Sequence, residues 1–250
     1  MQEVKARLMG KQRFVSLEEL AQIPTPEAEG IWRPVSHIEA VETVKEQVGA
    51  SGWGIVEEQY GLVGEKGEKL FGVMTIESQD HPDWRHCIGI RNSHDKSIRL
   101  GVCAGLSVIV CSNLCFGGNK TVQRKHTTRI DVKDVVRQAF QELPSSFEIL
   151  ERRMDELKSK RITDDQARAI LVHLAAAEAI PSCDILNVFN EYKEPRHPEF
   201  ERERVWDLFN AVTEISHKYS PVRADRTHTA LTRAFGLDGD IPGLKILSEL

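Results

Sequence analysis

The 250-residue sequence contains no long hydrophobic run, and this absence excludes several classes of protein at the outset. Its longest apolar stretches, such as 105–111, are far shorter than the roughly 20 residues that cross a bilayer. Residues 1–14 are charged throughout and lack the apolar core of a secretion signal. We therefore expect a cytoplasmic protein with no membrane partner.

Paired cysteine motifs are also lacking. No Cys-x-x-Cys occurs, and Cys111 and Cys115 stand four apart, where a zinc knuckle usually has cysteines three apart. The five cysteines are Cys87, Cys103, Cys111, Cys115 and Cys183. Their odd number and apolar neighbours predict reduced, buried thiols in a reducing compartment.

Aromatic residues make up only 6% of the chain, and the segment 81–130 has no glutamate at all. Its only acids are Asp83 and Asp95, although the whole chain carries a net charge of −5. Its basic residues are Arg85, Arg91, Lys96, Arg99, Lys120, Arg124, Lys125 and Arg129. Such an asymmetry favours an anionic partner, although a solvated sheet face gives the same pattern.

Hydrophobic periodicity divides the chain into an irregular arm (1–33), a helix and sheet region (34–130) and a helical half (131–250). In the arm, Ser16 and Glu19 predict one capped helical turn. Ser36 then begins a helix that we expect Gly49 to end. A hairpin around the glycine-rich turn 64–67 and several short strands follow, at 54–63, 69–77, 85–91, 98–103, 106–111 and 121–129.

The period becomes helical from Asp131 onward. Asp131 caps a helix that Pro144 is expected to end, and new helices open at Ser145 and Thr163. Further helices are expected at 182–192, from Pro198, and at 226–235. The fold class is therefore α+β, with an N-terminal helix and an antiparallel sheet of five or six strands, followed by a helical C-terminal half packed on the same fold.

The most pointed polar motif is the loop Asn92-Ser93-His94-Asp95, which Lys96 and Ser97 follow. These small polar residues suit a tight turn, because their side chains bond the local backbone. The alternative is a ligand-facing loop in which His94 and Asp95 bind phosphate, a metal or a catalytic water.

Known catalytic patterns are absent. The histidines lack the helical i, i+4 spacing of a zinc site, and there is no nucleophile elbow or phosphate loop. We assign no cofactor, metal ligand or catalytic residue, and expect binding rather than catalysis. A metal-dependent nuclease or hydrolase built on His94, Asp95 and His126 stays open as a third hypothesis.

Nucleic-acid binding has more support, because basic side chains follow an extended segment and Phe116 offers a stacking surface. The residues expected to contact nucleic acid are Arg91, Lys96, Arg99, Phe116, Lys120, Arg124, Lys125, His126 and Arg129.

Three motifs in 92–127 resemble a known family: Asn-Ser-His-Asp at 92–95, Val-Cys-Ser-Asn at 110–113 and Arg-Lys-His-Thr at 124–127. Pro-Val-Ser-His at 34–37, Phe-Gly-Val at 71–73 and Trp-Asp-Leu-Phe-Asn-Ala-Val-Thr-Glu at 206–214 extend the likeness. The chain resembles the phage- and plasmid-related proteins grouped as domain of unknown function 932, over roughly 34–235.

The resemblance implies a mobile element that acts inside a bacterial cell. Our first hypothesis is a protein that binds single-stranded DNA or RNA in replication or recombination, as a homo-oligomer such as a ring or filament. The second is an interaction protein that binds a host factor, for example in counter-defence, with the charged stretch 191–204 as its surface.

Overall fold

The structure is a computed structural model, which describes residues 12–77, 84–108, 114–116, 122–197, 200 and 203–237. The strands in these residues are β1 (Arg13–Val15), β2 (Ile55–Val63), β3 (Lys69–Ile76), β4 (Trp84–Ser93), β5 (Leu100–Val108), β6 (Leu114–Phe116) and β7 (Val122–Arg124). The helices are α1 (Leu17–Ala21), α2 (His37–Ala50), α3 (Val132–Ser159), α4 (Asp164–Ala176), η1 (Ser182–Asp184), α5 (Ile185–Lys193), α6 (Val205–Ser216) and α7 (Pro221–Phe235).

The strands form one antiparallel sheet in the order β1-β2-β3-β4-β5-β6, and β7 pairs with the first part of β5. The hairpin between β2 and β3 turns through Gly64 and Gly67, whose φ angles of 98° and 73° suit glycine. The segment that follows β7 continues the edge, because Trp32 and Thr127 form an isolated bridge. The N-terminal arm therefore lies beside the end of the sheet.

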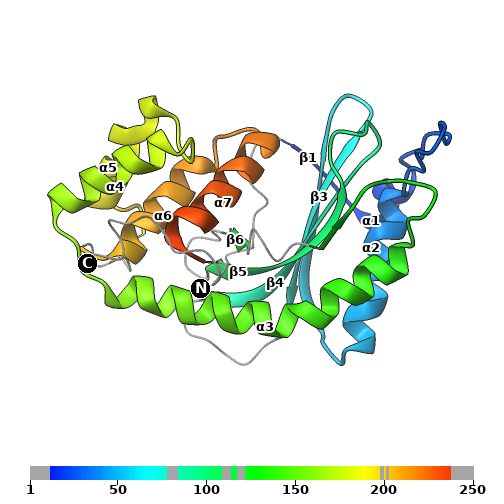
Figure 1. Cartoon of the computed structure of the whole chain (residues 1–250), viewed down its shortest axis with the longest axis horizontal. Coiled ribbons are helices and arrows are strands. Elements are labelled where there is room, and N and C mark those ends of the chain that lie inside the picture. Colours follow the sequence, from blue (N-terminus) through cyan, green and yellow to red (C-terminus); the bar gives the residue numbers. More distant parts are fainter. Residues whose placement is uncertain are drawn as a thin grey trace.

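Helices α2 and α3 cover the same face of the sheet. His37 at the start of α2 bonds Asn92 of β4, and Phe147 of α3 stacks on His86 of the same strand. Helix α3 runs along the molecule from the sheet to the group formed by α4, α5, α6 and α7 (Figure 1). One hydrophobic core extends through both halves, so the sheet and the helices are packed together.

The structure confirms the α+β fold class, with the sheet in the N-terminal half and helices in the C-terminal half. The capping boxes at Ser16–Glu19 and Thr163–Gln166 form as predicted, whereas the one expected at Ser145–Glu148 lies inside α3 and Ser36 makes no side-chain cap hydrogen bond. Gly236 ends α7 in the left-handed conformation, as its position suggested. At these three helix ends, capping residues close together in the sequence predicted the end correctly.

Other sequence expectations are corrected. Helix α3 passes through Pro144, because its apolar face continues on both sides, with Leu143 and Phe147 buried. Gly49 lies inside α2, and β5 runs unbroken through Gly105. In α3 and β5 burial of a continuous face outweighs the local preference of one residue, whereas α2 ends only one exposed residue after Gly49.

Two expected boundaries also moved. Helix α6 begins at Val205 and not at Pro198, which lies outside the described residues. The arm expected to be irregular contains β1, whose Phe14 lies opposite Gly61 of β2, as well as the short helix α1. The arm therefore adds an edge strand to the sheet.

Candidate nucleic-acid interface

A cluster of buried histidines holds one end of the sheet together. His37 is fully buried, and its Nε2 lies 3.0 Å from the carbonyl oxygen of Gly67, to which it donates. Its Nδ1 accepts from the amide of Asn92 at 3.0 Å. The ring of His94 stacks on His37 with centroids 3.7 Å apart and planes 3° from parallel. These contacts fasten β4 to α2 and to the hairpin turn.

The histidines of this cluster are neutral. Burial, and to a lesser extent the neighbouring His94, lower the pKa of His37 to about 4. Burial also lowers the pKa of His94, whose Nε2 donates to the carbonyl of Val35 at 3.0 Å. Because His37 accepts at one ring nitrogen and donates at the other, its tautomer is fixed.

His126 joins the residues that follow β7 to the start of β5. Its Nε2 accepts a hydrogen bond from the backbone N–H of Leu100 at 3.1 Å, and burial lowers its pKa. Arg99 precedes Leu100 and Lys125 precedes His126, so this one bond brings two exposed basic side chains to the same corner. His126 was expected to touch nucleic acid, but it is buried and acts by holding its neighbours in place.

The motif loop forms a tight turn. Asp95 accepts from the backbone N–H of Ser97 at 3.0 Å, and Ser93 bonds both backbone groups of Ile98. Burial acts to raise the pKa of Asp95, but hydrogen bonds from Lys69 and Ser97 outweigh it and lower the pKa to about 2. Ser93 and Asp95 therefore serve the turn, whereas the buried side chains of Asn92 and His94 bond Val35 and His37 outside it.

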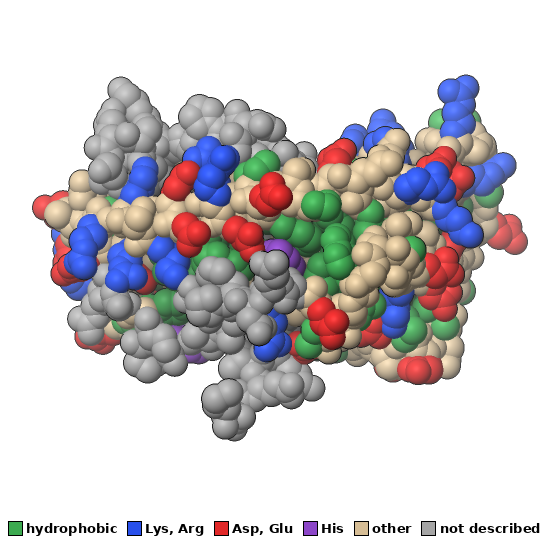
Figure 2. All heavy atoms as spheres, turned by 90° about the horizontal axis from the view of Figure 1, so that it is seen from below, with side chains coloured by type: hydrophobic (Ala, Val, Ile, Leu, Met, Phe, Trp, Pro, Cys, Tyr) green, Lys and Arg blue, Asp and Glu red, His purple; other side chains and the backbone are tan. Residues whose placement is uncertain are grey.

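The basic residues near this corner differ in how far they are neutralised. Lys96 pairs with Glu29 and lies 4.9 Å from the ring centroid of Trp32. Arg124 donates to the side-chain amide of Gln138. Acidic and basic side chains are mixed at the end of the molecule where α1 and α2 lie (Figure 2).

Close to His126, the exposed cations Arg99, Lys125 and Arg129 have no carboxylate partner among the described residues. With Arg124 they form a group that we name the basic corner. These cations remain available to an anionic ligand.

A row of residues crosses the sheet beside the basic corner. The strand register sets Phe71 opposite Arg91, Arg91 opposite Gly101, and Gly101 opposite Gln123. Directly opposed residues project from the same face, here the face away from α2 and α3. The row continues through Gly61 to Phe14, which is 50% exposed. Exposed Arg99 directly precedes β5.

Phe14 and Phe71 are aromatic side chains that sequence reasoning missed. Phe14 was assigned to an irregular arm, and Phe71 was counted only as a strand former. Strand β3 is apolar at most positions and buried from Gly72 to Ile76, so no sequence alternation separates its two faces. Two aromatics therefore flank Gly61 on the face that carries Arg91.

Some expected contact residues cannot be placed. Lys120 and the turn at 117–119 lie outside the described residues, as does the Val-Cys-Ser-Asn motif at 110–113. Phe116 belongs to β6, but only its backbone is described. The basic corner and the cross-sheet row are therefore defined without them.

The geometry offers little to the hydrolase hypothesis. Across the described ranges, no three His, Cys, Asp or Glu side chains are arranged to hold a metal ion. His94 uses Nε2 as a donor to Val35, and His126 uses Nε2 as an acceptor from Leu100.

In the part of the chain that the structure describes, no helix has both the length and the apolar character that crossing a membrane requires.

Comparison with known proteins gives one match. A family model described as Domain of unknown function (DUF932) matches residues 29–235, which is most of the chain. The chain belongs to this family. No curated protein and no solved structure matches it. In this DUF932 protein, the resembling segments 34–37, 92–95 and 124–127 meet in the histidine cluster, each through its histidine.

Proposed function

We propose that this protein binds single-stranded nucleic acid across the cross-sheet row and the basic corner. The observation that carries the proposal is the hydrogen bond between Leu100 and His126, which sets exposed Arg99 beside exposed Lys125. Basic side chains that follow a phosphate backbone beside aromatic rings are the usual features of single-strand binding.

The chemistry of the surface fits an extended strand. Phe14 and Phe71 lie on either side of Gly61, two strand spacings or roughly 10 Å apart. Bases stack on such rings without sequence preference, while Arg99 and Lys125 meet the phosphates. The proposal includes a role in replication or recombination of a phage or plasmid, in the cytoplasm of its bacterial host.

The first test is fluorescence anisotropy with a labelled single-stranded oligonucleotide at several salt concentrations, and with a matching duplex. We expect tighter binding to the single strand, and affinity that falls with salt. The variant Arg99→Gln/Lys125→Gln should bind about 10- to 100-fold more weakly, and its log–log salt slope should be smaller by about 1.4, or 0.7 for each lost phosphate contact.

A matched control removes the same charge elsewhere. Lys66 and Arg152 are exposed, one in the hairpin turn and one on α3, so Lys66→Gln/Arg152→Gln should bind almost as the wild type. Phe14→Ala should weaken binding without changing the salt slope, because it removes stacking alone. Equal losses in both charge variants, or no binding at low salt, would overturn the proposal and leave the host-factor hypothesis.

A further inference from the structure

The loop between α1 and α2 carries an apolar side chain that the fold leaves uncovered. Ile31 is 75% exposed, the largest exposed fraction of any large hydrophobic side chain among the described residues. In Figure 1 this loop, drawn in dark blue, projects from the end of the molecule where α1 and α2 lie. A single exposed apolar side chain is ordinary by itself, so the surroundings of Ile31 decide whether it has a role.

The backbone of this turn is held in one conformation. Glu29 and Trp32 exchange two backbone hydrogen bonds, of 3.2 and 2.9 Å, around Gly30 and Ile31. Gly30 has a φ of 57° and Ile31 does not have a positive φ, which is the pattern of a type II′ hairpin turn. The backbone N–H of Thr128 donates to the carbonyl of Ile31 at 2.9 Å. Polar residues usually occupy such turns, and the Ile31 side chain has no part in closing this one.

The turn is fastened to the segment that follows β7. Trp32 pairs with Thr127 in an isolated bridge, and the backbone N–H of Arg33 donates to the carbonyl of His126 at 3.2 Å. Lys96 lies over the Trp32 ring, 4.9 Å from its centroid. Since His126 also holds the start of β5, the turn and the basic corner are parts of one connected edge.

Basic side chains surround Ile31. Arg33 is exposed, and its Nη1 lies within 3.4 Å of two carbonyl oxygens of the turn, so its guanidinium is held against the turn. Lys125 and Arg129 belong to the short segment whose backbone bonds the turn. Like them, Arg33 has no carboxylate partner among the described residues. Glu29 of the turn is already paired with a lysine, so the surface around the apolar tip is positively charged.

Cations around an aliphatic tip fit the end of a nucleic-acid duplex better than a single base. Single bases stack on aromatic rings, such as those of Phe14 and Phe71 in the cross-sheet row. Aliphatic side chains instead wedge between base steps of a duplex. The terminal pair of a duplex leaves one broad apolar face in water, and covering that face is favourable. The surface therefore changes from aromatic on β1 and β3 to aliphatic at the turn.

We propose that the protein recognises the junction between single-stranded and duplex nucleic acid, with Ile31 packed against the terminal base pair. Arg33 and Arg129 contact the phosphates that flank this pair, and the single strand continues over the basic corner onto the cross-sheet row. This inference rests on the proposed binding of single strands and names the class of ligand more closely. The preferred ligand is a duplex with a single-stranded tail.

The test measures fluorescence anisotropy of the full chain with three labelled DNA ligands: a single strand, a blunt duplex, and a duplex that carries the same single strand as a tail. We expect the tailed duplex to bind about 10-fold more tightly than the single strand, because burial of Ile31 adds to the contacts of the tail. Ile31→Ser should remove that difference and leave the affinity for the single strand within about twofold of the wild type. Ile31→Leu should keep the difference.

A fluorescent base analogue and a matched variant make the test specific. With 2-aminopurine in the terminal base pair, binding of the wild type should change the emission, and binding of Ile31→Ser should not. Val172→Ser is the control, because it removes another β-branched side chain, 57% exposed on α4, and should bind all three ligands as the wild type does. Both serine variants should melt as the wild type does, since both side chains are exposed.

The outcomes separate this inference from the proposed function. Equal affinity of the wild type for the tailed duplex and the single strand, or an undiminished preference in Ile31→Ser, would overturn the junction assignment and leave single-strand binding intact. No binding of the wild type to any of the three ligands would overturn the proposed function as well. Binding to vesicles of anionic lipid that depends on Ile31, without a preference for the tailed duplex, would assign the turn to a membrane surface instead.

Discussion

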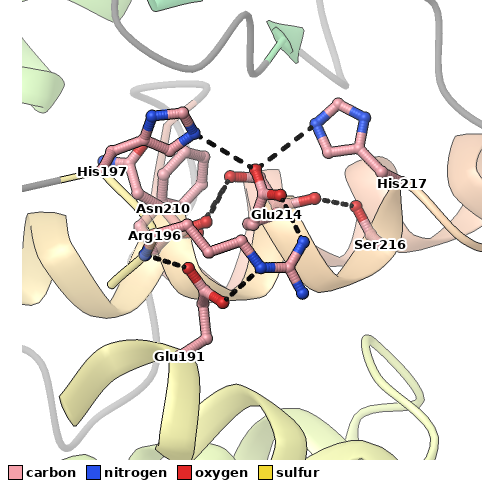
Figure 3. A network of polar contacts seen from close by, with 9 residues as sticks. Glu191, Arg196, His197, Asn210, Glu214, Ser216 and His217 are labelled. Atoms are coloured by element: carbon pink, nitrogen blue, oxygen red, sulfur yellow. Dashed lines mark hydrogen bonds and ion pairs between the residues drawn. The ribbon is translucent and has the colours of Figure 1, made fainter. Parts of the chain in front are cut away.

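Histidines occur in two very different settings in this protein. At the sheet end, His37 and His94 are buried, stacked and neutral, and each is committed to backbone or amide partners. In the helical half, His197 and His217 are partly exposed and face a carboxylate that Arg196 also contacts (Figure 3). The same side chain is thus enclosed by the core in one region and partly exposed to solvent in the other.

The largest predicted effect is a difference in the free energy of unfolding between histidine variants of the two regions. His37→Ala removes a fully buried ring, two hydrogen bonds and a stacking partner. We expect a loss of about 3 kcal/mol in the free energy of unfolding, measured by urea denaturation. His217→Ala should reduce it by less, because this side chain is 26% exposed. Similar losses in both variants would mean that the two settings do not differ as described.

The next prediction concerns the stability of the folded protein at acidic pH. The pKa of His37 is about 4 in the folded protein, and burial likewise lowers the pKa of His228 to about 4. Unfolded histidine binds a proton below about pH 6.5. The unfolded state therefore binds more protons between pH 6.5 and 4, and stability falls as pH falls through that window.

For His37 the loss should be on the order of 3 kcal/mol. Measuring the free energy of unfolding at a series of pH values checks this, and His37→Gln should flatten the curve. An unchanged slope in this variant would show that His37 titrates alike in both states. The pKa values of Asp95 and Asp184 are lowered, so these carboxyl groups change stability at still lower pH and do not contribute between pH 6.5 and 4.

A smaller effect tests the ion pairs that Arg196 forms with Glu191 and Glu214. Arg196→Met leaves Glu191 and Glu214 facing each other without their shared cation. Because the guanidinium is largely exposed, the expected loss is only about 1 kcal/mol. Adding Glu214→Gln should restore part of the loss in thermal melts. No difference between the single and double variants would mean that the two carboxylates do not interact.

Sequence reasoning predicted local features well where neighbours in the chain supply the physics. The capping box at Ser16, the box at Thr163 and the left-handed Gly236 each depend on a few adjacent residues. It failed at Pro144, where the cost of a lost helical hydrogen bond is local but the buried face of α3 extends over 28 residues. Tertiary packing decided that case.

The candidate sites show the same contrast between what the sequence predicts and what tertiary packing decides. The sequence by itself determined that 81–130 is basic, that the fold is α+β and that the motifs at 92–95 and 124–127 are related to a family. Only the tertiary structure decided which cations are neutralised, since Lys96 meets Glu29 from 67 residues away. It also decided that His126 is buried and that Glu214 faces two histidines. Pairing and burial depend on distances through space, and a linear pattern of residue types does not contain those distances.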